Sequence, residues 1–354
     1  MSGAWRLLAD DGVGAAEGLA LDEALMARYR HEAQKSAPTL RLYSYRDHCA
    51  LIGRYQNLNA EVDLAACRRT DTQVSRRLTG GGAIVMGAGQ LGVAYLDRCR
   101  AGERPRETIA ALANGLVAGL AELGITASFH GKNDLEVAGR KIAGLGLYVD
   151  EAGAMIFHAS VLAHLDVGLM LEVLRIPAAK LADRAVAAVS ERITTVSAET
   201  GSVWDAARIR PFIAKGFESG FEVDLDPALV DAEEEALANA LAISRYGSQS
   251  WLDERSVADD ASGSAMLKTP AGLARIYLAT HCGLVKSAMV VGDFNELPPE
   301  MAAMESGLRW RRLDHASVLD VVARSGAADA LGVSAAQLVE IIIEAGASSR
   351  GSDA

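Results

Sequence analysis

The chain has 354 residues, of which half are hydrophobic and 23% carry a charge, and this composition excludes a disordered or collagen-like protein. The 46 acidic residues outnumber the 35 basic ones, and the net charge of −11 would repel a phosphate backbone, so we expect no general binding to nucleic acid. No apolar run reaches the ~18 residues of a membrane span, and the amino terminus lacks the regions of a secretion signal. We therefore expect a cytoplasmic protein without a membrane segment.

The first predicted elements are a helix over residues 18–29 and short strands over 40–45 and 50–53. Apolar residues recur at helical spacing in the first segment. Asp22 and Glu23 fall in the early turns of this predicted helix, where negative charge favours the helix dipole.

The middle of the chain predicts a strand, turn and strand over residues 75–96, because its glycine clusters would be costly inside a helix. A long amphipathic helix follows from Ile109 and ends at Gly124, a suitable cap residue. Residues 134–149 predict a hairpin and residues 157–165 a further strand.

The chain becomes helical and rich in alanine after Pro177, and the polar residues 245–265 read as a connection between two domains. Ser334 and Gln337 form a capping box at the start of the last predicted helix. The elements predicted beyond the connection are strands over 274–280 and 283–291 and a helix over 334–345.

Four cysteines, Cys49, Cys67, Cys99 and Cys282, lie far apart, and no C-x-x-C pair is present. This spacing suits neither a structural zinc site nor a disulfide framework. We therefore predict four reduced thiols.

A glycine-rich segment is the first candidate for chemistry. Arg76 and Arg77 offer planar forks for carboxylate or phosphate oxygens, and Thr79 follows them. The three glycines Gly80, Gly81 and Gly82 then remove the side chains where a ligand would lie against the backbone. Taken alone, this segment is equally typical of a glycine-rich hairpin turn beside surface arginines.

Two further segments carry polar residues suited to a nucleotide. Asn133 and Asp134 offer an amide and a carboxylate for a ribose, a phosphate or Mg²⁺, although such a pair is usually only a turn. Lys141 lies between Gly139 and Gly144, and His158 follows one strand later. A lone lysine is more often a solvated surface group, and a lone histidine on a strand is more often a core residue.

The order and spacing of the three segments resemble the family of lipoate-protein ligases, octanoyltransferases and biotin-protein ligases. The matching runs are Gly18-Leu-Ala-Leu-Asp-Glu-Ala-Leu, Leu51-Ile-Gly-Arg-Tyr-Gln-Asn, Arg76-Arg-Leu-Thr-Gly-Gly-Gly-Ala, Asn133-Asp-Leu, Lys141-Ile-Ala-Gly, His158 and Arg192-Ile-Thr-Thr-Val. The basic loop of biotin ligases fits less well than the lipoate pattern.

The resemblance implies an α/β (α+β) fold. The catalytic domain would contain a mixed sheet and span residues 1–250. A run from residue 274 to 294, ending in Gly292-Asp-Phe, resembles the smaller α+β accessory domain of many lipoate ligases. We expect that domain over residues 266–345 and a flexible tail over 346–354.

The family also implies roles for individual residues. Lys141 would hold the reacting carboxyl group and the α-phosphate, while Asn133 and Asp134 would contact the nucleotide and Mg²⁺. The acyl and phosphate pocket would be lined by Arg76, Arg77, Thr79, Gly80, Gly81, Gly82, Gln90, Gly144 and His158.

The sequence mixes features of two branches of the family. The run Gly87-Ala-Gly-Gln-Leu, which contains Gln90, resembles octanoyltransferases rather than ligases. Octanoyltransferases, however, need a cysteine just after a proline near the end of this domain, and here Pro177 is followed by Ala178 and Ala179.

The resemblance therefore implies an ATP-dependent, Mg²⁺-requiring ligase. Such an enzyme activates lipoate or octanoate as an acyl-adenylate and transfers it to a lysine of a lipoyl-domain or lipoate-binding acceptor protein. The mixed features suit a specialised acceptor, such as a lipoate-binding protein of sulfur oxidation. The alternatives are an acyltransferase that uses no ATP and a non-catalytic protein that binds lipoyl domains.

Overall fold

The computed structural model describes residues 3–30, 36–100, 102–131, 133–176, 189–257, 261 and 263–349. Contacts divide the chain into two compact units. The first unit comprises Met1–Ile52, Glu61–Thr79 and Ala83–Leu252. The second comprises Gly53–Ala60, Gly80–Gly82 and Asp253–Ala354.

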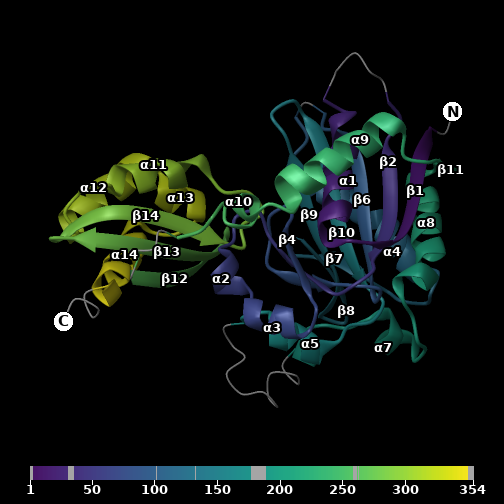
Figure 1. Cartoon of the computed structure of the whole chain (residues 1–354), viewed down its shortest axis with the longest axis horizontal. Coiled ribbons are helices and arrows are strands. Elements are labelled where there is room, and N and C mark those ends of the chain that lie inside the picture. The colour runs from purple at the N-terminus through teal and green to yellow at the C-terminus, as the bar shows by residue number, and fades with distance from the viewer. Residues whose placement is uncertain are drawn as a thin grey trace. The chain divides into compact units, whose positions relative to one another are not determined.

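The first unit is built on an eight-stranded mixed sheet (Figure 1). Its strands run in the order β11 (Asp224–Pro227), β1 (Ala4–Val13), β2 (Thr39–Tyr45), β6 (Gln90–Arg98), β10 (Ala154–Leu162), β9 (Arg140–Val149), β8 (Asp134–Val137) and β7 (Ser128–His130). Strand β1 pairs in parallel with β11 and β2, and the remaining pairs are antiparallel.

Helices cover both faces of this sheet. Helices α1 (Ala15–Ala27) and α9 (Ala232–Leu241) lie on one face, and α4 (Pro105–Ala121) and α8 (Ala206–Phe221) lie on the other. Side chains alternate between the faces, so Ile156 of β10 packs toward α1 and its neighbour Phe157 packs toward α4 and α8.

Helices α4 and α8 touch through glycines. A Cβ on Gly216 would lie 2.2 Å from the Gly119 nitrogen and 2.3 Å from the Gly115 carbonyl oxygen. Only glycine permits this approach, which holds α8 against the sheet.

Short elements complete the first unit. A three-stranded sheet has the order β4 (Gln73–Arg76), β3 (Cys49–Ile52) and β5 (Ile84–Met86). The short helices of this unit are α3 (Leu64–Arg69), α5 (Val167–Val173), α7 (Val196–Thr200), a π-helical turn (Ala242–Tyr246) and α10 (Gln249–Leu252). Helix α2 (Leu58–Glu61) belongs to the second unit except for its last residue.

The second unit has an antiparallel sheet in the order β12 (Gly263–Thr269), β13 (Gly272–His281) and β14 (Leu284–Gly292). Its helices are α11 (Pro299–Leu308), α12 (His315–Ser325), α13 (Ala327–Leu331) and α14 (Ala335–Ser349). Apolar side chains from these strands and helices form one core. The predicted α/β class, with a mixed sheet and a smaller carboxy-terminal sheet and helix unit, is confirmed.

Three sequence expectations are wrong in detail. The first helix starts at Ala15, so Asp22 and Glu23 lie in its middle and are buried. Strand β12 was missed: its first residues, 263–265, fall in the predicted connection, and its outward residues are exposed, which hides the alternation of a strand. The expected tail does not begin at residue 346, because α14 continues to Ser349, and a Cβ on Gly346 would lie 2.0 Å from a methyl carbon of Leu313.

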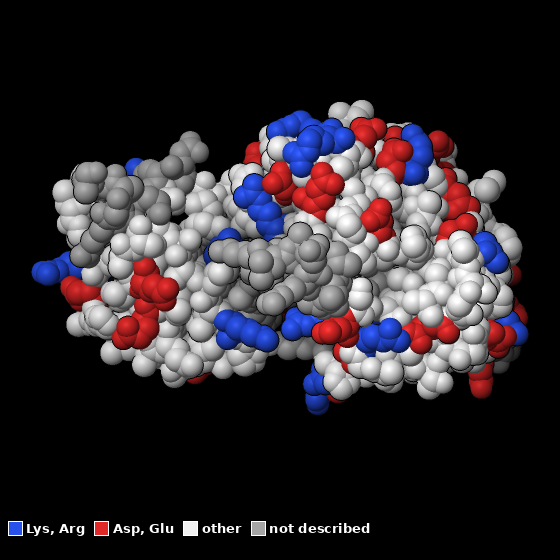
Figure 2. Space-filling model, turned by 90° about the horizontal axis from the view of Figure 1, so that it is seen from below, with Lys and Arg blue, Asp and Glu red and all other residues white. Residues whose placement is uncertain are grey.

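The predicted helical segment after Pro177 begins among residues 177–188, which lie outside the described residues. No helix of the described part is both long and apolar enough to cross a membrane. On the face drawn in Figure 2, basic and acidic side chains are mixed and form no continuous basic stripe.

Candidate active site

Lys141 and Asp134 form an ion pair between adjacent strands, with 2.7 Å between the lysine Nζ and the aspartate Oδ1. Each side chain is one-third exposed. The backbone of Lys141 is fixed because its N–H donates to the Arg192 carbonyl and its carbonyl accepts from the Thr194 N–H, both at 2.8 Å. A Cβ on Gly144 would lie 3.0 Å from Nζ, so the lysine side chain crosses bare backbone.

The buried Oδ1 of Asp134 makes no hydrogen bond to any described residue, because the short contact with Lys141 has the distance but not the angles of one. A carboxylate oxygen of this kind suits a cation. Mg²⁺ commonly takes one or two carboxylates together with phosphate oxygens. No group of three or more potential ligands gathers in the described part of the chain. Asp134 therefore fits a Mg²⁺ that arrives with a nucleotide rather than a resident metal centre.

Asn133 precedes Asp134 and shapes the same turn. Its carbonyl accepts a hydrogen bond from the Leu145 N–H at 2.7 Å. This contact secures the Asn133–Asp134 turn against β9, although it uses the backbone of Asn133 rather than the side-chain amide.

A second polar group joins Thr79, His158 and Asp22. The Nδ1 of His158 lies 3.3 Å from the Thr79 hydroxyl, and its Nε2 lies 3.0 Å from Oδ2 of Asp22. Thr79 and Asp22 are each 1% exposed, while the His158 side chain is 13% exposed. A Cβ on Gly146 would lie 3.2 Å from the Cβ of Thr79, so the threonine packs on bare backbone of β9.

Asp22 is held by further donors. Arg41 is fully buried. Its Nη1 donates to Oδ1 of Asp22, and its Nε donates to Oδ2 of Asp10, both at 2.6 Å. The Tyr43 hydroxyl donates to Oδ2 at 3.1 Å. Burial alone would raise the pKa of Asp22, but the Arg41 charge and the hydrogen bonds from His158 and Arg41 hold that pKa below its usual range.

The two groups share one face of the sheet. Gly144 and Gly146 are two residues apart in β9, which places them about 7 Å apart on the same face. Ser160 and His158 lie opposite these glycines on β10. Lys141 and His158 therefore stand at two ends of this glycine strip, and the side chains of Lys141 and Thr79 pack over its bare backbone.

Arg76 and Arg77 do not join this strip. Arg76 is fully buried and donates to the carbonyls of Trp251 at 3.0 Å and Leu252 at 2.6 Å. Arg77 donates to the Leu51 carbonyl at 2.9 Å, and burial lowers its pKa to about 10. These contacts anchor both arginines to backbone carbonyls of the first unit, and the expected contact of Arg76 and Arg77 with a phosphate stays a prediction.

The three glycines Gly80, Gly81 and Gly82 belong to the second unit. The Gly81 N–H donates to the Phe294 carbonyl at 2.8 Å. A Cβ on Gly80 would lie 2.0 Å from the same carbonyl, so a larger residue would not fit there. Gly82 lies beside Asp293.

Gln90 begins strand β6 and is 3% exposed. Its amide nitrogen donates to the His164 carbonyl at 2.5 Å, and its buried Oε1 has no hydrogen-bond partner among the described residues. This side chain therefore braces the end of a strand, and it makes no described contact with Lys141 or His158.

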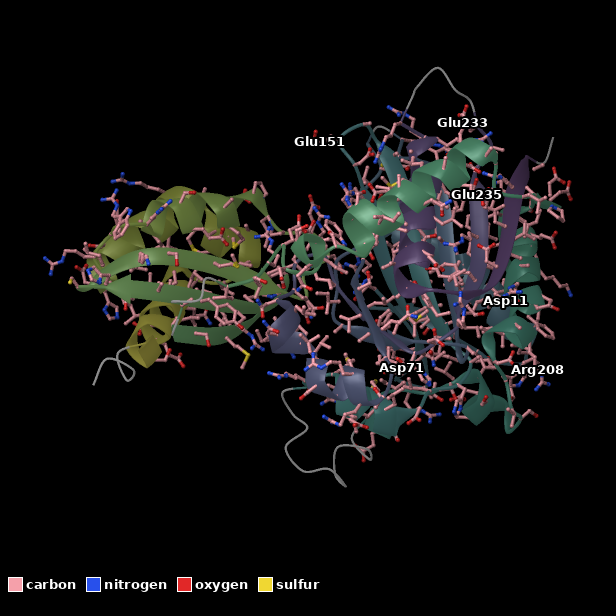
Figure 3. The ribbon with its side chains drawn as sticks, viewed as in Figure 1. Asp11, Asp71, Glu151, Arg208, Glu233 and Glu235 are labelled. Carbon is pink, nitrogen blue, oxygen red and sulfur yellow. The ribbon has the colours of Figure 1, made fainter. Side chains whose placement is uncertain are left out.

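Sequence reasoning missed the roles of Asp22, Arg41, Tyr43 and Asp10. The available signal was an acidic pair, Asp22 and Glu23, within an apolar helix, since carboxylates are rarely fully buried unless they are paired. Surface carboxylates look different: Glu233 and Glu235 of α9, both labelled in Figure 3, are exposed.

Neither polar group contains a cysteine. Cys49 is fully buried in β3, and burial raises the pKa of its thiol well above the ordinary value. Burial also raises the thiol pKa of Cys67 and of Cys99. Cys282 is exposed in the second unit. None of the three thiols in the first unit has the lowered pKa of a cysteine nucleophile.

The sequence model of the lipoyl protein ligase A/B catalytic domain matches residues 14–218. The octanoyltransferase LipM of Symbiobacterium thermophilum is 31% identical over 273 residues, which cover 70% of this chain and 97% of that protein.

Solved structures are also similar. A bipartite lipoate-protein ligase of Thermoplasma acidophilum, described with its E2 lipoyl domain, has a TM-score of 0.63, 27% identity, and covers 71% of this chain and 96% of its own. Lipoate-protein ligase A bound with ATP has a TM-score of 0.61 and is 25% identical. The match covers 71% of this chain and 98% of that one. LipL1 of P. falciparum, solved in complex with lipoate, has a TM-score of 0.69, and the match covers 90% of this chain and 94% of that one. Because the two are only 15% identical, this similarity shows the fold alone.

Proposed function

The chain belongs to the lipoyl protein ligase A/B catalytic-domain family, and from this premise we propose that it is an ATP-dependent lipoate-protein ligase. It would activate lipoate or octanoate as an acyl-adenylate and transfer the acyl group to a lysine of an acceptor protein. The domain limits expected above, 1–250 and 266–345, are part of this proposal.

The observation that carries the proposal is the contrast between Lys141 and the cysteines. Lys141 presents a partly exposed ammonium group beside bare backbone and a carboxylate that fits Mg²⁺. Each thiol of the first unit has a raised pKa and therefore makes a poor acyl acceptor. A ligase asks its protein for charge and positioning rather than for a nucleophile.

In the first half-reaction the lipoate carboxylate attacks the α-phosphorus of ATP, and the bond to the β-phosphate breaks to release pyrophosphate. Lys141 leaves Asp134 and contacts the carboxylate and an α-phosphate oxygen, where it stabilises the developing charge. Asp134 would hold Mg²⁺ together with phosphate oxygens. When bound, Mg²⁺ neutralises charge on the phosphates.

In the second half-reaction the amine of the acceptor lysine attacks the acyl carbon, and AMP leaves. Lys141 donates a hydrogen bond to the acyl oxygen as charge develops on it. Acceptor choice depends on surface complementarity, so a lipoyl domain and a lipoate-binding protein of sulfur oxidation are both candidates.

A second candidate is an octanoyltransferase that takes its acyl group from a carrier protein without ATP. The 31% identity to LipM and the Gly-x-Gly-Gln-Leu run favour it. It would need a nucleophile other than the thiols of the first unit.

The deciding experiment is lipoate-dependent exchange of labelled pyrophosphate into ATP, with octanoate and biotin in parallel. We expect Mg²⁺-dependent exchange with lipoate or octanoate and none with biotin. Absence of exchange, with and without an acceptor domain, would refute the ligase. Transfer from octanoyl carrier protein without ATP would then establish the second candidate. Loss of both activities with retained binding of a lipoyl domain would identify a binding protein.

A further inference from the structure

We infer that the open edge of strand β14 in the second unit binds an acidic segment of a protein partner, which adds to the sheet as an extended strand. This surface lies outside residues 14–218, which match the catalytic-domain family, so the inference goes beyond the proposed ligase reaction. We call it the β14 edge site and define it by Lys286, Ala288, Arg309, Trp310 and Arg311, all in the second unit.

Strand β14 is an outer strand of its sheet, and its outer edge is closed at two points (Figure 1). Near the start of the strand, the Val285 N–H donates to the Arg311 carbonyl at 2.8 Å. The Trp310 N–H donates to the Val285 carbonyl at 2.6 Å. Further along, the Val290 N–H donates to Oε1 of Glu305 at 2.7 Å. These bonds leave a gap in the edge between Val285 and Val290.

Ala288 lies in this gap and turns its backbone polar groups outward. In an antiparallel strand, alternate residues direct both the N–H and the C=O to the same side. The Val290 N–H points away from β13, and β13 pairs with Ala288 and Val290 in continuous register, so the Ala288 N–H points away as well. Among the described residues, neither backbone group of Ala288 has a hydrogen-bond partner. An unpaired N–H and C=O on an edge strand form a template for another strand.

A surface cavity makes this stretch of the edge accessible. Its volume is about 490 Å³, which lies within the range of about 300–1,000 Å³ that is typical of binding sites. The cavity is lined by residues 286–288 of β14, by Glu305 and Ser306 of α11, and by Arg309 and Trp310. Because Glu305 is bonded to Val290, its carboxylate ends the open stretch and does not cover Ala288.

Trp310 has the properties of an anchor for a partner. Its side chain is 54% exposed, and its φ of +62° lies in the left-handed region, which favours glycine and disfavours a bulky residue. A glycine would form the same turn with less strain, so the turn alone does not explain an indole at this position. Tryptophan and arginine are enriched among the residues that contribute most to binding at protein interfaces.

The charges of the β14 edge site select an acidic partner. Lys286, Arg309 and Arg311 are exposed, and neither arginine side chain pairs with a described residue. The chain as a whole carries a net charge of −11, so this positive charge is local. Positive side chains along an edge also oppose its pairing with a second copy of itself.

The backbone chemistry favours a peptide over a nucleic acid. A phosphodiester would satisfy the positive charges, but it offers no donor for the Ala288 carbonyl. A peptide strand offers both a donor and an acceptor at the required spacing, and its side chains can carry the negative charge.

The test measures binding of defined peptides to the full-length protein by titration calorimetry. The probe is a short blocked peptide of alternating glutamate and valine, and we expect it to bind with a Kd below about 1 mM. The same peptide with every backbone nitrogen methylated has lost its donors and should bind at least about tenfold more weakly. A peptide of alternating lysine and valine should not bind, because its charge is repelled.

Two variants test the side chains. Trp310→Gly should weaken binding of the acidic peptide at least about tenfold. Its Tm should stay equal or rise, because glycine adopts the positive φ readily. Arg309→Glu combined with Arg311→Glu should reverse the preference toward the lysine peptide.

The matched control makes the same change of charge elsewhere in the second unit. Lys268 and Arg324 are exposed and belong to β12 and α12, so Lys268→Glu combined with Arg324→Glu should leave binding of the acidic peptide unchanged to within about threefold.

Four results would overturn the inference. They are no binding of the acidic peptide, equal binding of its methylated form, an equal loss in the control variant, and tighter binding of a single-stranded oligothymidylate than of the peptide. The last result would assign the surface to nucleic acid. A dimer in sedimentation that Trp310→Gly dissociates would assign the edge to a second copy of the chain and would also overturn the inference.

Discussion

Asp22 and Asp134 each bind a cation in the same unit, but they do so in opposite surroundings. Asp22 is 1% exposed, and its oxygens are taken by Arg41, Tyr43 and His158. Asp134 is 33% exposed and forms an ion pair with the equally exposed Lys141. Burial makes the first network costly to rearrange, while the second pair can open at little cost when a nucleotide arrives. One end of the site is therefore prebuilt and the other is adaptable.

The largest effect should come from the adaptable end. Lys141→Ala should lower pyrophosphate exchange by about 10²–10³-fold, because it removes a charged donor to the transition state. The free energy of unfolding should change by less than about 1 kcal/mol, since the ion pair is partly exposed. Exchange kinetics and urea unfolding measure the two quantities. The exposed Lys268 gives a control, Lys268→Ala, with normal exchange, and full activity of Lys141→Ala would remove Lys141 from the mechanism.

The prebuilt end should show the reverse pattern, with a large effect on folding. Arg41→Leu leaves Asp22 buried without its main partner and should cost about 3–5 kcal/mol of unfolding free energy. The double variant Arg41→Leu with Asp22→Leu removes both charges and should recover much of that loss. Urea unfolding measures both, and equal stability of the single and double variants would contradict a coupled buried pair.

The sequence predicted the adaptable end better than the prebuilt end, and the reason is distance along the chain. Asp134, Lys141 and Gly144 fall within one hairpin, whose local pattern is readable. Asp22 and His158 are 136 residues apart, and their contact depends on how α1 packs against β10. That packing follows from the register of the whole sheet, which no local pattern encodes.

The contacts of Arg76 were also not predictable from the local sequence. Its place before three glycines indicated a ligand contact, but its partners Trp251 and Leu252 come 175 and 176 residues later. The sheet class, most strand positions and the last helix were predictable because they follow from hydrophobic periodicity and capping. Burial of a charged side chain was not, since it depends on segments that meet only in the folded chain.

A medium effect should follow from changing the carboxylate of the adaptable end. Asp134→Asn removes the proposed Mg²⁺ ligand, so the Mg²⁺ concentration needed for half-maximal exchange should rise by about 10–100-fold. Unfolding free energy should change little. Titration of exchange with Mg²⁺ at saturating ATP measures this. Glu151→Gln, at an exposed site labelled in Figure 3, is the control. An unchanged Mg²⁺ requirement in Asp134→Asn would assign the ion to other groups.

The smallest effect concerns acid stability and tests the prebuilt end again. Because the folded pKa of Asp22 lies below its unfolded value of about 3.9, this carboxylate adds stability above that pH and loses it as the pH falls through the folded pKa. Asp22→Asn should therefore flatten the fall in unfolding free energy below about pH 4. Urea unfolding from pH 6 downward measures the slope.

Asp97 supplies a control of opposite sign. Burial raises its pKa, so its folded form binds a proton more readily than its unfolded form, and its contribution to stability decreases as the pH rises above about 4. Asp97→Asn should thus make stability rise more steeply with pH in that range, while Asp22→Asn makes it rise less steeply below it. If both variants changed the slope in the same direction, overall charge rather than the Arg41–Asp22 network would govern acid unfolding.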